Sequence, residues 1–302
     1  MMMRILVVGL MAVCLSVSAF AYEEVTMTDG GSLSGTVRLA GKAPKPKGYN
    51  LVTFPDPVYC GRISDGRGWR LLQTFHVGTS HAFQDVVVMI EGIEKGKKFE
   101  FKAPRIEAID CMFKPFTTVV WDRHPVEVVN MDPVMHDIQA YETSNLGPRV
   151  LFNVPLPMNP LHPREMNHAA QYHGHLAGQP MTQTVHMTKG RRVFVMQCGF
   201  HAYMESWGIA VDDPYYAVTD QDGRFEIADI PPGTYHVTVW HPMAGAKEYD
   251  VTVDPKGENI LNVSMDVPTG RLYANEAVEN PRFGLGLMKG QPIMPTLERQ
   301  TY

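Results

Sequence analysis

The residues with the most distinctive chemistry lie in the stretch 193–204, which reads VFVMQCGFHAYM. Cys198, His201 and Met204 follow one another at intervals of three residues after a short apolar run. A thiolate, two imidazoles and a weak axial thioether form the ligand set that suits one redox-active copper ion. The stretch supplies one imidazole, so the second must come from elsewhere in the chain, and His136 is the best candidate.

His136 closes the stretch 128–136, VVNMDPVMH, in which a strand runs into a turn that presents the imidazole. Here the sequence resembles the cupredoxin family, which has an Asn-x-Asp turn before its first histidine ligand and a Cys-x-x-His-x-x-Met type of ligand loop. The resemblance covers residues 105–212 and implies a Greek-key β-sandwich with one type 1, or blue, copper site. The ligands that it implies are His136, Cys198, His201 and Met204.

The same resemblance assigns supporting roles to residues beside the ligands. Asn130 belongs to the turn, and Asp137 stands where many cupredoxins carry an asparagine that braces the cysteine loop. We expect the Asp137 carboxylate to accept backbone N–H bonds in the same way, while its charge favours oxidised copper. Phe200 and Tyr203 flank the ligands, and His201 is expected to lie nearest the surface. Apolar cover near an exposed histidine suits the weak docking of a redox partner.

Residues 1–21 have one Arg, an apolar run and a small-x-small end, which predict a secretory signal peptide cut after Ala21. A lipoprotein cut at Cys14 is the alternative. No later stretch is long and apolar enough to span a bilayer. The formal net charge is −5, and no basic run indicates nucleic-acid binding. We therefore expect a periplasmic or secreted protein.

Cysteine usage supports a metal role for Cys198. Loss of the signal peptide removes Cys14 and leaves three cysteines in a compartment that favours disulfides. An odd cysteine in such a protein needs an explanation. Cys60 and Cys111 can pair and leave Cys198 for a metal; free or metal-binding roles for the first two are the alternative.

The spacing of apolar residues predicts an all-β protein. Gly and Pro number 26 and 23, which suits many short strands joined by turns. Alternating or continuous apolar runs predict strands at 34–40, 85–90, 126–129 and 193–196. No amphipathic helix of ordinary length stands out.

The stretch 216–240 is similar to the carboxypeptidase regulatory-like family, a small transthyretin-like sandwich. Asp222-Gly223 predicts a hairpin turn, because Gly accepts a positive φ. This second resemblance implies that two separated segments build one sandwich, with the cupredoxin domain inserted between its strands. The predicted divisions are a signal peptide at 1–21, the sandwich at 22–104 and 213–266, the cupredoxin domain at 105–212 and an irregular tail at 267–302.

The stretch 155–189 is rich in His and Met and has little periodicity, which predicts a long loop. His168, His173 and His175 in this loop are candidates for a second, labile metal site. The competing interpretation is a polar lid over the copper that packs its own side chains.

Together these features predict a type 1 copper protein that transfers single electrons between redox partners such as a c-type cytochrome. Such a protein could also be a subunit of a larger complex. No nucleophile elbow or nucleotide-binding motif is present, and Gln197 and Gly199 flank Cys198 where copper oxidases carry a histidine, so we predict no enzyme. The alternatives are a copper-binding or delivery protein and a structural β-protein of an envelope complex.

Overall fold

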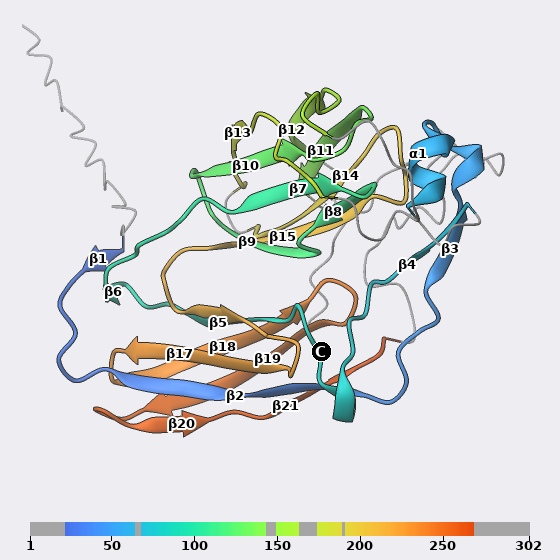
Figure 1. The fold of residues 1–302 in the computed structure, drawn as a ribbon. Coiled ribbons are helices and arrows are strands. Elements are labelled where there is room, and N and C mark those ends of the chain that lie inside the picture. Colours follow the sequence, from blue (N-terminus) through green and yellow to red (C-terminus); the bar gives the residue numbers. More distant parts are fainter. Residues whose placement is uncertain (1–21, 64–67, 143–148, 163–173, 189–190, 269–302) are drawn as a thin grey trace, which may run out of the picture.

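The computed structural model describes residues 22–63, 68–142, 149–162, 174–188 and 191–268. These residues are nearly all β-structure, arranged as two packed pairs of sheets, one above the other in Figure 1. The predicted all-β fold class is confirmed. In the described part of the chain, the helices are too short and too polar to be candidates for crossing a membrane.

The upper pair of sheets, which we call the site sandwich, contains the predicted ligands. One sheet has the order β13-β10-β7-β8 and the other the order β12-β11-β14-β15-β9. Its strands are β7 (Arg105–Ile109), β8 (Met112–Lys114), β9 (Thr117–Trp121), β10 (Pro125–Asn130), β11 (His136–Glu142), β12 (Arg149–Leu156), β13 (Met181–Thr184), β14 (Val193–Gln197) and β15 (Glu205–Val211). Alternate side chains such as Val126 and Val128 point into its core.

The prediction of one long loop at 155–189 is wrong in part. Strand β12 continues to Leu156, and β13 pairs antiparallel with β10 at the edge of its sheet. The four residues of β13 are polar or half-buried, because an edge strand with one solvated face needs no apolar run. Propensity and periodicity therefore gave no signal for this strand.

The lower pair of sheets, the second sandwich, uses chain on both sides of the site sandwich. Its sheets have the orders β16-β5-β18-β19 and β17-β2-β20, and β21 also pairs with β2. Its strands are β2 (Gly31–Ala40), β5 (Val87–Glu91), β16 (Tyr216–Val218), β17 (Arg224–Ile230), β18 (Gly233–His241), β19 (Gly245–Val253), β20 (Glu258–Ile260) and β21 (Val263–Asp266). The short strands β1 (Glu23–Glu24) and β6 (Lys95–Gly96) pair beside it. The domain boundaries at 104, 212 and 266 stay predictions.

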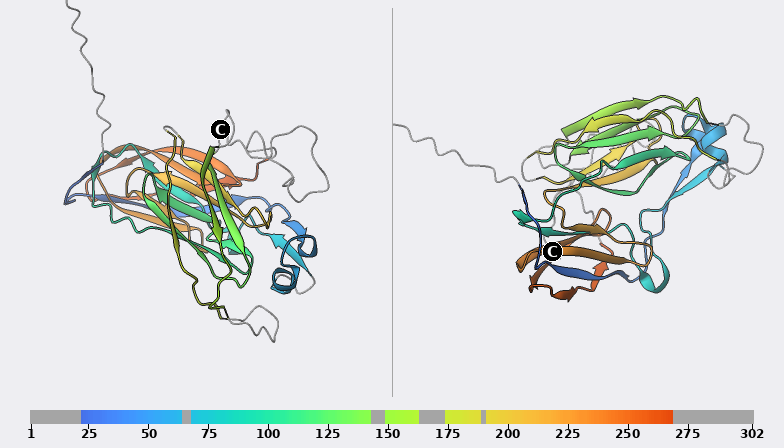
Figure 2. Two further views of the ribbon diagram at one scale, coloured as in Figure 1. Left: turned by 90° about the horizontal axis from the view of Figure 1, so that it is seen from above. Right: turned by 60° about the vertical axis from the view of Figure 1, so that its left-hand side comes forward.

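One part of the predicted first sandwich segment packs elsewhere. The chain from β3 (Lys47–Asn50) through η1 (Leu51–Thr53) and α1 (Pro57–Arg62) to β4 (Trp69–Leu72) forms an arm that we call the cap segment. Its apolar residues Leu51, Tyr59, Cys60 and Ile63 belong to the core of the site sandwich. Figure 2 shows this arm rising beside the second sandwich to the end of the site sandwich. The predicted Cys60–Cys111 disulfide is present and links the cap segment to the turn between β7 and β8.

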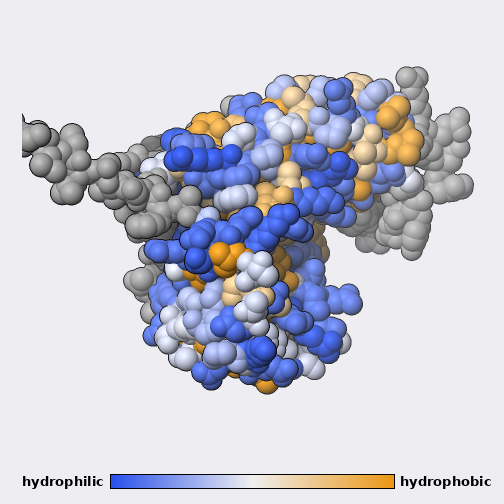
Figure 3. Space-filling model, turned by 90° about the vertical axis from the view of Figure 1, so that its left-hand side faces the viewer, coloured by the Kyte–Doolittle hydropathy of each residue, from blue (hydrophilic) through white to orange (hydrophobic). Residues whose placement is uncertain are grey.

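The two sandwiches share a buried apolar layer. Val87, Met89 and Trp240 of the second sandwich pack with Val195 and Trp207 of the site sandwich. The side view in Figure 3 shows a mainly hydrophilic outer surface with small, scattered hydrophobic areas on both parts. Burial of this layer holds the site sandwich and the second sandwich together.

Asp213 at the junction of the two sandwiches predicts a pH-dependent stability. Burial, with the nearby charges of Asp212 and Glu91, raises the pKa of Asp213 to about 7. A carboxyl with a raised pKa stabilises the fold fully below about pH 4, and this contribution is lost as the pH rises through about 7. The free energy of unfolding should therefore fall between these values, by up to about 4 kcal/mol for a shift of about three units.

The measurement is urea unfolding at pH 5 and pH 7.5 for wild type and Asp213→Asn. The variant should lose most of the difference between the two pH values. Asp266→Asn is the matched control, since the exposed Asp266 side chain pairs with Lys247, is not among the charges that act on Asp213, and should leave the slope unchanged. An equal pH slope in wild type and Asp213→Asn would contradict the prediction.

Candidate metal centre

Strand pairing brings the predicted ligands together at one end of a sheet. His136 opens β11, and Cys198 directly follows β14, its antiparallel neighbour, with Gln139 opposite Gln197. The loop then turns back on itself: the Met204 N–H donates to His201 O, 2.8 Å away, and the Cys198 N–H donates to Met204 O at 3.2 Å. One tight loop and one strand end therefore supply all four side chains.

Three potential ligand atoms converge in the core. The Nδ1 atoms of His136 and His201 are 3.2 Å apart, and Cys198 Sγ is 3.6 Å from His201 Nδ1. The three residues form a group whose ligand atoms all lie within 4.8 Å of one another. All three are fully buried, and Met204 is fully buried in the same core cluster.

The hydrogen-bond partners of the two histidines fix which nitrogen faces the centre. His136 Nε2 lies 3.0 Å from the Asp132 carboxylate, and His201 Nε2 lies 3.0 Å from the carbonyl oxygen of Pro55. Both partners only accept hydrogen bonds, so each Nε2 carries the proton and each Nδ1 presents a lone pair. Two lone pairs 3.2 Å apart repel each other unless a cation lies between them.

The spacing of these atoms fits a bound metal ion. With metal–nitrogen bonds of about 2.0–2.1 Å and near-tetrahedral angles, two ligand nitrogens lie about 3.1–3.4 Å apart. The two Nδ1 atoms are at 3.2 Å. A longer metal–sulfur bond accounts for the larger separation of 3.6 Å between Cys198 Sγ and His201 Nδ1. The donor set therefore fits a single ion.

Burial sets the protonation of the side chains in the absence of a cation. It raises the pKa of the Cys198 thiol to about 12, with the Asp137 charge adding to the effect. Burial and the neighbouring His136 lower the pKa of His201 to about 4. A cation among these groups would displace the thiol proton, because the thiolate is the form that binds a metal.

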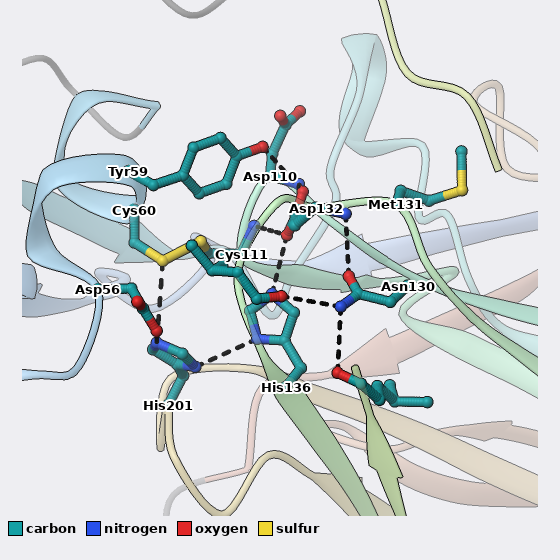
Figure 4. A network of polar contacts seen from close by, with 12 residues as sticks. Asp56, Tyr59, Cys60, Asp110, Cys111, Asn130, Met131, Asp132, His136 and His201 are labelled. Atoms are coloured by element: carbon teal, nitrogen blue, oxygen red, sulfur yellow. Dashed lines mark hydrogen bonds and ion pairs between the residues drawn. A yellow bond between two sulfur atoms is a disulfide. The ribbon is translucent and has the colours of Figure 1, made fainter. Parts of the chain in front are cut away.

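Asp132 is the hub of the polar network around His136 (Figure 4). Besides His136, its carboxylate accepts hydrogen bonds from the Tyr59 hydroxyl at 2.9 Å and from the backbone N–H groups of Asp110 and Cys111 at 2.8 Å each. Burial alone would raise the pKa of Asp132, but these bonds hold it below its usual value. Asp110 and Cys111 both have left-handed backbone angles, so the carboxylate also stabilises a strained turn between β7 and β8.

Asn130 holds the turn that carries His136. Its side-chain oxygen accepts the N–H of Asp132, and its amide group donates to the carbonyl oxygens of Val134, Leu156 and Pro157. These bonds tie the turn to the end of β12. Asn130 thus acts on the centre through the backbone that positions Asp132 and His136.

Asp137 braces the cysteine loop, as expected from its position after His136. Its Oδ1 atom accepts the N–H of Gly199 at 2.5 Å and lies 3.2 Å from Cys198 Sγ. Its other oxygen accepts the side-chain amide of Gln139. A carboxylate therefore takes the bracing position at the sulfur.

The prediction that His201 lies nearest the surface is wrong. The cap segment covers it: beyond the Pro55 bond, Asp56 Oδ2 and Cys60 Sγ each lie 3.8 Å from His201 Nε2 (Figure 4). The residue is fully buried, as is the flanking Tyr203, whose ring packs against His201. Phe200 remains at the surface, with 37% of its area exposed.

The predicted second group of histidines is only partly described. His168 and His173 lie outside the described residues. His175 lies beside Asp110, with 3.1 Å between Nε2 and Oδ1, and its Nδ1 is 3.1 Å from the carbonyl oxygen of Met131. It therefore lies close to the centre but contributes no atom to the group of His136, Cys198 and His201.

Several residues that lie around the centre were not assigned from the sequence. Asp132 had a usable signal, because a carboxylate four residues before a histidine ligand in a tight turn is a natural hydrogen-bond partner for its imidazole. Pro55, Asp56 and Tyr59 had none, since they reach the centre only through the packing of the cap segment.

Comparison with known proteins separates the two parts of the chain. Residues 209–266 match the family model of the carboxypeptidase regulatory-like domain. No curated protein sequence matches this chain. These 58 residues supply most strands of the second sandwich, so the match to the regulatory-like family lies in that sandwich.

Similar solved structures include copper proteins. A purple cupredoxin from Nitrosopumilus maritimus is 17% identical, with 36% of this chain and 99% of that chain covered and a TM-score of 0.25. Auracyanin from Roseiflexus castenholzii is 11% identical, with 37% and 98% covered and a TM-score of 0.24. A copper-containing nitrite reductase from Thermus scotoductus is 17% identical, with 39% of this chain but only 24% of that chain covered and a TM-score of 0.25.

Proposed function

We propose that this protein binds one type 1 copper ion and transfers single electrons between redox partners. His136, Cys198 and His201 would form the trigonal ligand set, with Met204 as the weak axial ligand. The observation that carries the proposal is the convergence of two imidazole lone pairs and one thiol in a fully buried space. A thioether beside a single thiolate favours copper over zinc.

The residues of this chain would hold the ligands in fixed positions and exclude water from the centre. A type 1 copper ion cycles between its two oxidation states with little change in ligand positions. Asp132 and Pro55 hold the two imidazoles by their outer nitrogens, and Asp137 holds the loop of Cys198. Burial of every proposed ligand excludes water from the centre.

The partner and the compartment belong to the same proposal. The Cys60–Cys111 disulfide supports a periplasmic or secreted location, because such bonds persist in oxidising compartments. A small, transient interface with a redox protein such as a c-type cytochrome suits electron exchange. Electrons would cross the cap segment or the region of Phe200, since the imidazoles of His136 and His201 are both fully buried.

The test is visible absorption and electron paramagnetic resonance of the copper-loaded protein and of Cys198→Ser. We expect an intense thiolate-to-copper(II) band with narrow copper hyperfine splitting in wild type, and complete loss of the band in the variant. Met204→Leu is the matched control, since removal of an axial thioether should keep the band and change the reduction potential.

Each alternative gives a different result. A copper delivery protein would prefer copper(I), stay colourless and lose its metal to competing chelators. A structural β-protein would bind no stoichiometric copper. A band that persists unchanged in Cys198→Ser would defeat the ligand assignment.

A further inference from the structure

A second group of metal-binding side chains lies on the outer side of Asp132. Ligand atoms of Asp110, Asp132 and His175 all lie within 4.8 Å of one another. The Asp110 side chain is 29% exposed and that of His175 is 10% exposed, so ions can reach this group from solvent. Asp132 is fully buried and separates it from the group of His136, Cys198 and His201.

Both ring nitrogens of His175 face hydrogen-bond acceptors. Its Nδ1 lies 3.1 Å from the carbonyl oxygen of Met131, which can only accept a hydrogen bond. With the proton on Nδ1, Nε2 directs a lone pair at the Asp110 carboxylate, 3.1 Å away. Two acceptors at this distance need a proton or a metal ion between them.

A second imidazole lies next to this pair. The rings of His162 and His175 have centroids 5.2 Å apart and an interplanar angle of 65°. The rings of His136 and His201 have nearly the same relation, at 4.9 Å and 65°. His162 is buried, and its Nε2 lies 3.5 Å from the Tyr59 hydroxyl, which in turn donates to Asp132. A second imidazole ring thus lies beside the group of Asp110, Asp132 and His175.

We propose that Asp110 and His175, beside Asp132 and the His162 imidazole, form a second metal site for a divalent transition ion that prefers nitrogen and oxygen ligands. Imidazole and carboxylate donors suit copper(II) or zinc(II), and no sulfur ligand is available to make the site a type 1 centre. Asp132 keeps its four hydrogen bonds and connects the two sites. Of the three histidines predicted from the sequence, this site uses His175 alone.

The Asp132 carboxylate links the two sites through hydrogen bonds. One Asp132 oxygen accepts from His136, a proposed ligand of the first site. The other accepts from the N–H of Asp110, a proposed ligand of the second. Occupation of the outer site would therefore act on the His136 imidazole through one hydrogen-bonded residue.

The test uses copper(II) as the probe. Titration of wild type should show two equivalents, one with the thiolate band and one with the wide hyperfine splitting of a nitrogen- and oxygen-ligated ion. His175→Ala should lose the second equivalent and keep the first. Asp110→Asn keeps the shape of the turn residue and should also lose it, which guards against a folding defect in the first variant.

His236→Ala is the matched control. His236 lies 3.1 Å from Asp250 Oδ1, the same distance as in the proposed site, but its side chain is 43% exposed and lies on β18. This variant should retain both equivalents. A single equivalent in wild type, or a second equivalent that survives both His175→Ala and Asp110→Asn, would overturn the proposal.

The second site does not depend on the proposed electron-transfer function. If no thiolate band forms, the nitrogen- and oxygen-ligated signal still reports on the outer site through its sensitivity to His175→Ala. If the band forms and that signal is missing, the proposal of an outer site is wrong, while the proposal of a type 1 centre stands. Circular dichroism of each variant confirms that the β-structure is retained.

Discussion

Asp132→Asn should weaken metal binding by about 10- to 100-fold, because the residue orients a ligand without touching the metal. The carboxylate fixes the proton of His136 on Nε2 and so directs Nδ1 into the centre. An amide places an N–H group where the carboxylate only accepts. At least one of the donors from His136, Tyr59, Asp110 and Cys111 then loses its partner.

The same substitution should cost about 2–5 kcal/mol in the free energy of unfolding, because each buried donor left without a partner costs about 1–3 kcal/mol. Competition with a chelator measures the affinity, and urea unfolding measures the stability. Asp85→Asn is the matched control, since Asp85 pairs with His76 near the second sandwich. It should lower stability and leave the metal affinity unchanged. Equal metal affinity in wild type and Asp132→Asn would show that His136 needs no such support.

Removal of the disulfide should have the second large effect. Cys60 and Cys111 are 51 residues apart, and closing a loop of that length stabilises the fold by about 4 kcal/mol on the entropic model. The double variant Cys60→Ala/Cys111→Ala also frees α1 from the turn between β7 and β8. Because α1 and the residues before it cover His201, the centre should open to solvent as well.

Two measurements separate these consequences. Urea unfolding gives the stability, and the rate at which a chelator removes the metal reports the cover over His201. Val58→Ala, an exposed change in the same helix, is the control and should alter neither. A reduced stability with an unchanged rate of metal loss would mean that the cap segment holds its place through Leu51, Tyr59 and Ile63 alone.

The covered imidazole has a consequence for the choice of partner. In a centre with an exposed histidine edge, a partner docks directly over the ligand. Here Pro55, Asp56 and Cys60 occupy that position. We expect a partner to recognise the cap segment itself or the surface near Phe200.

The sequence by itself determined the residue types and the approximate place of the centre. Ligands in a loop of seven residues, 198–204, and a turn of seven, 130–136, are local features, and strand alternation is local as well. The disulfide followed from counting cysteines in an oxidising compartment. Such features are visible because neighbouring residues determine them.

Only the tertiary structure decided how the centre is enclosed. His201 is separated by 146 residues from Pro55, whose carbonyl oxygen accepts its hydrogen bond, and by 141 from Cys60, which lies over it. Asp132 meets Tyr59 across 73 residues, and His175 meets Asp110 across 65. These contacts arise because the apolar face of an arm is buried against the end of a distant sandwich. The periodicity within a single segment does not encode the surface against which the cap segment packs.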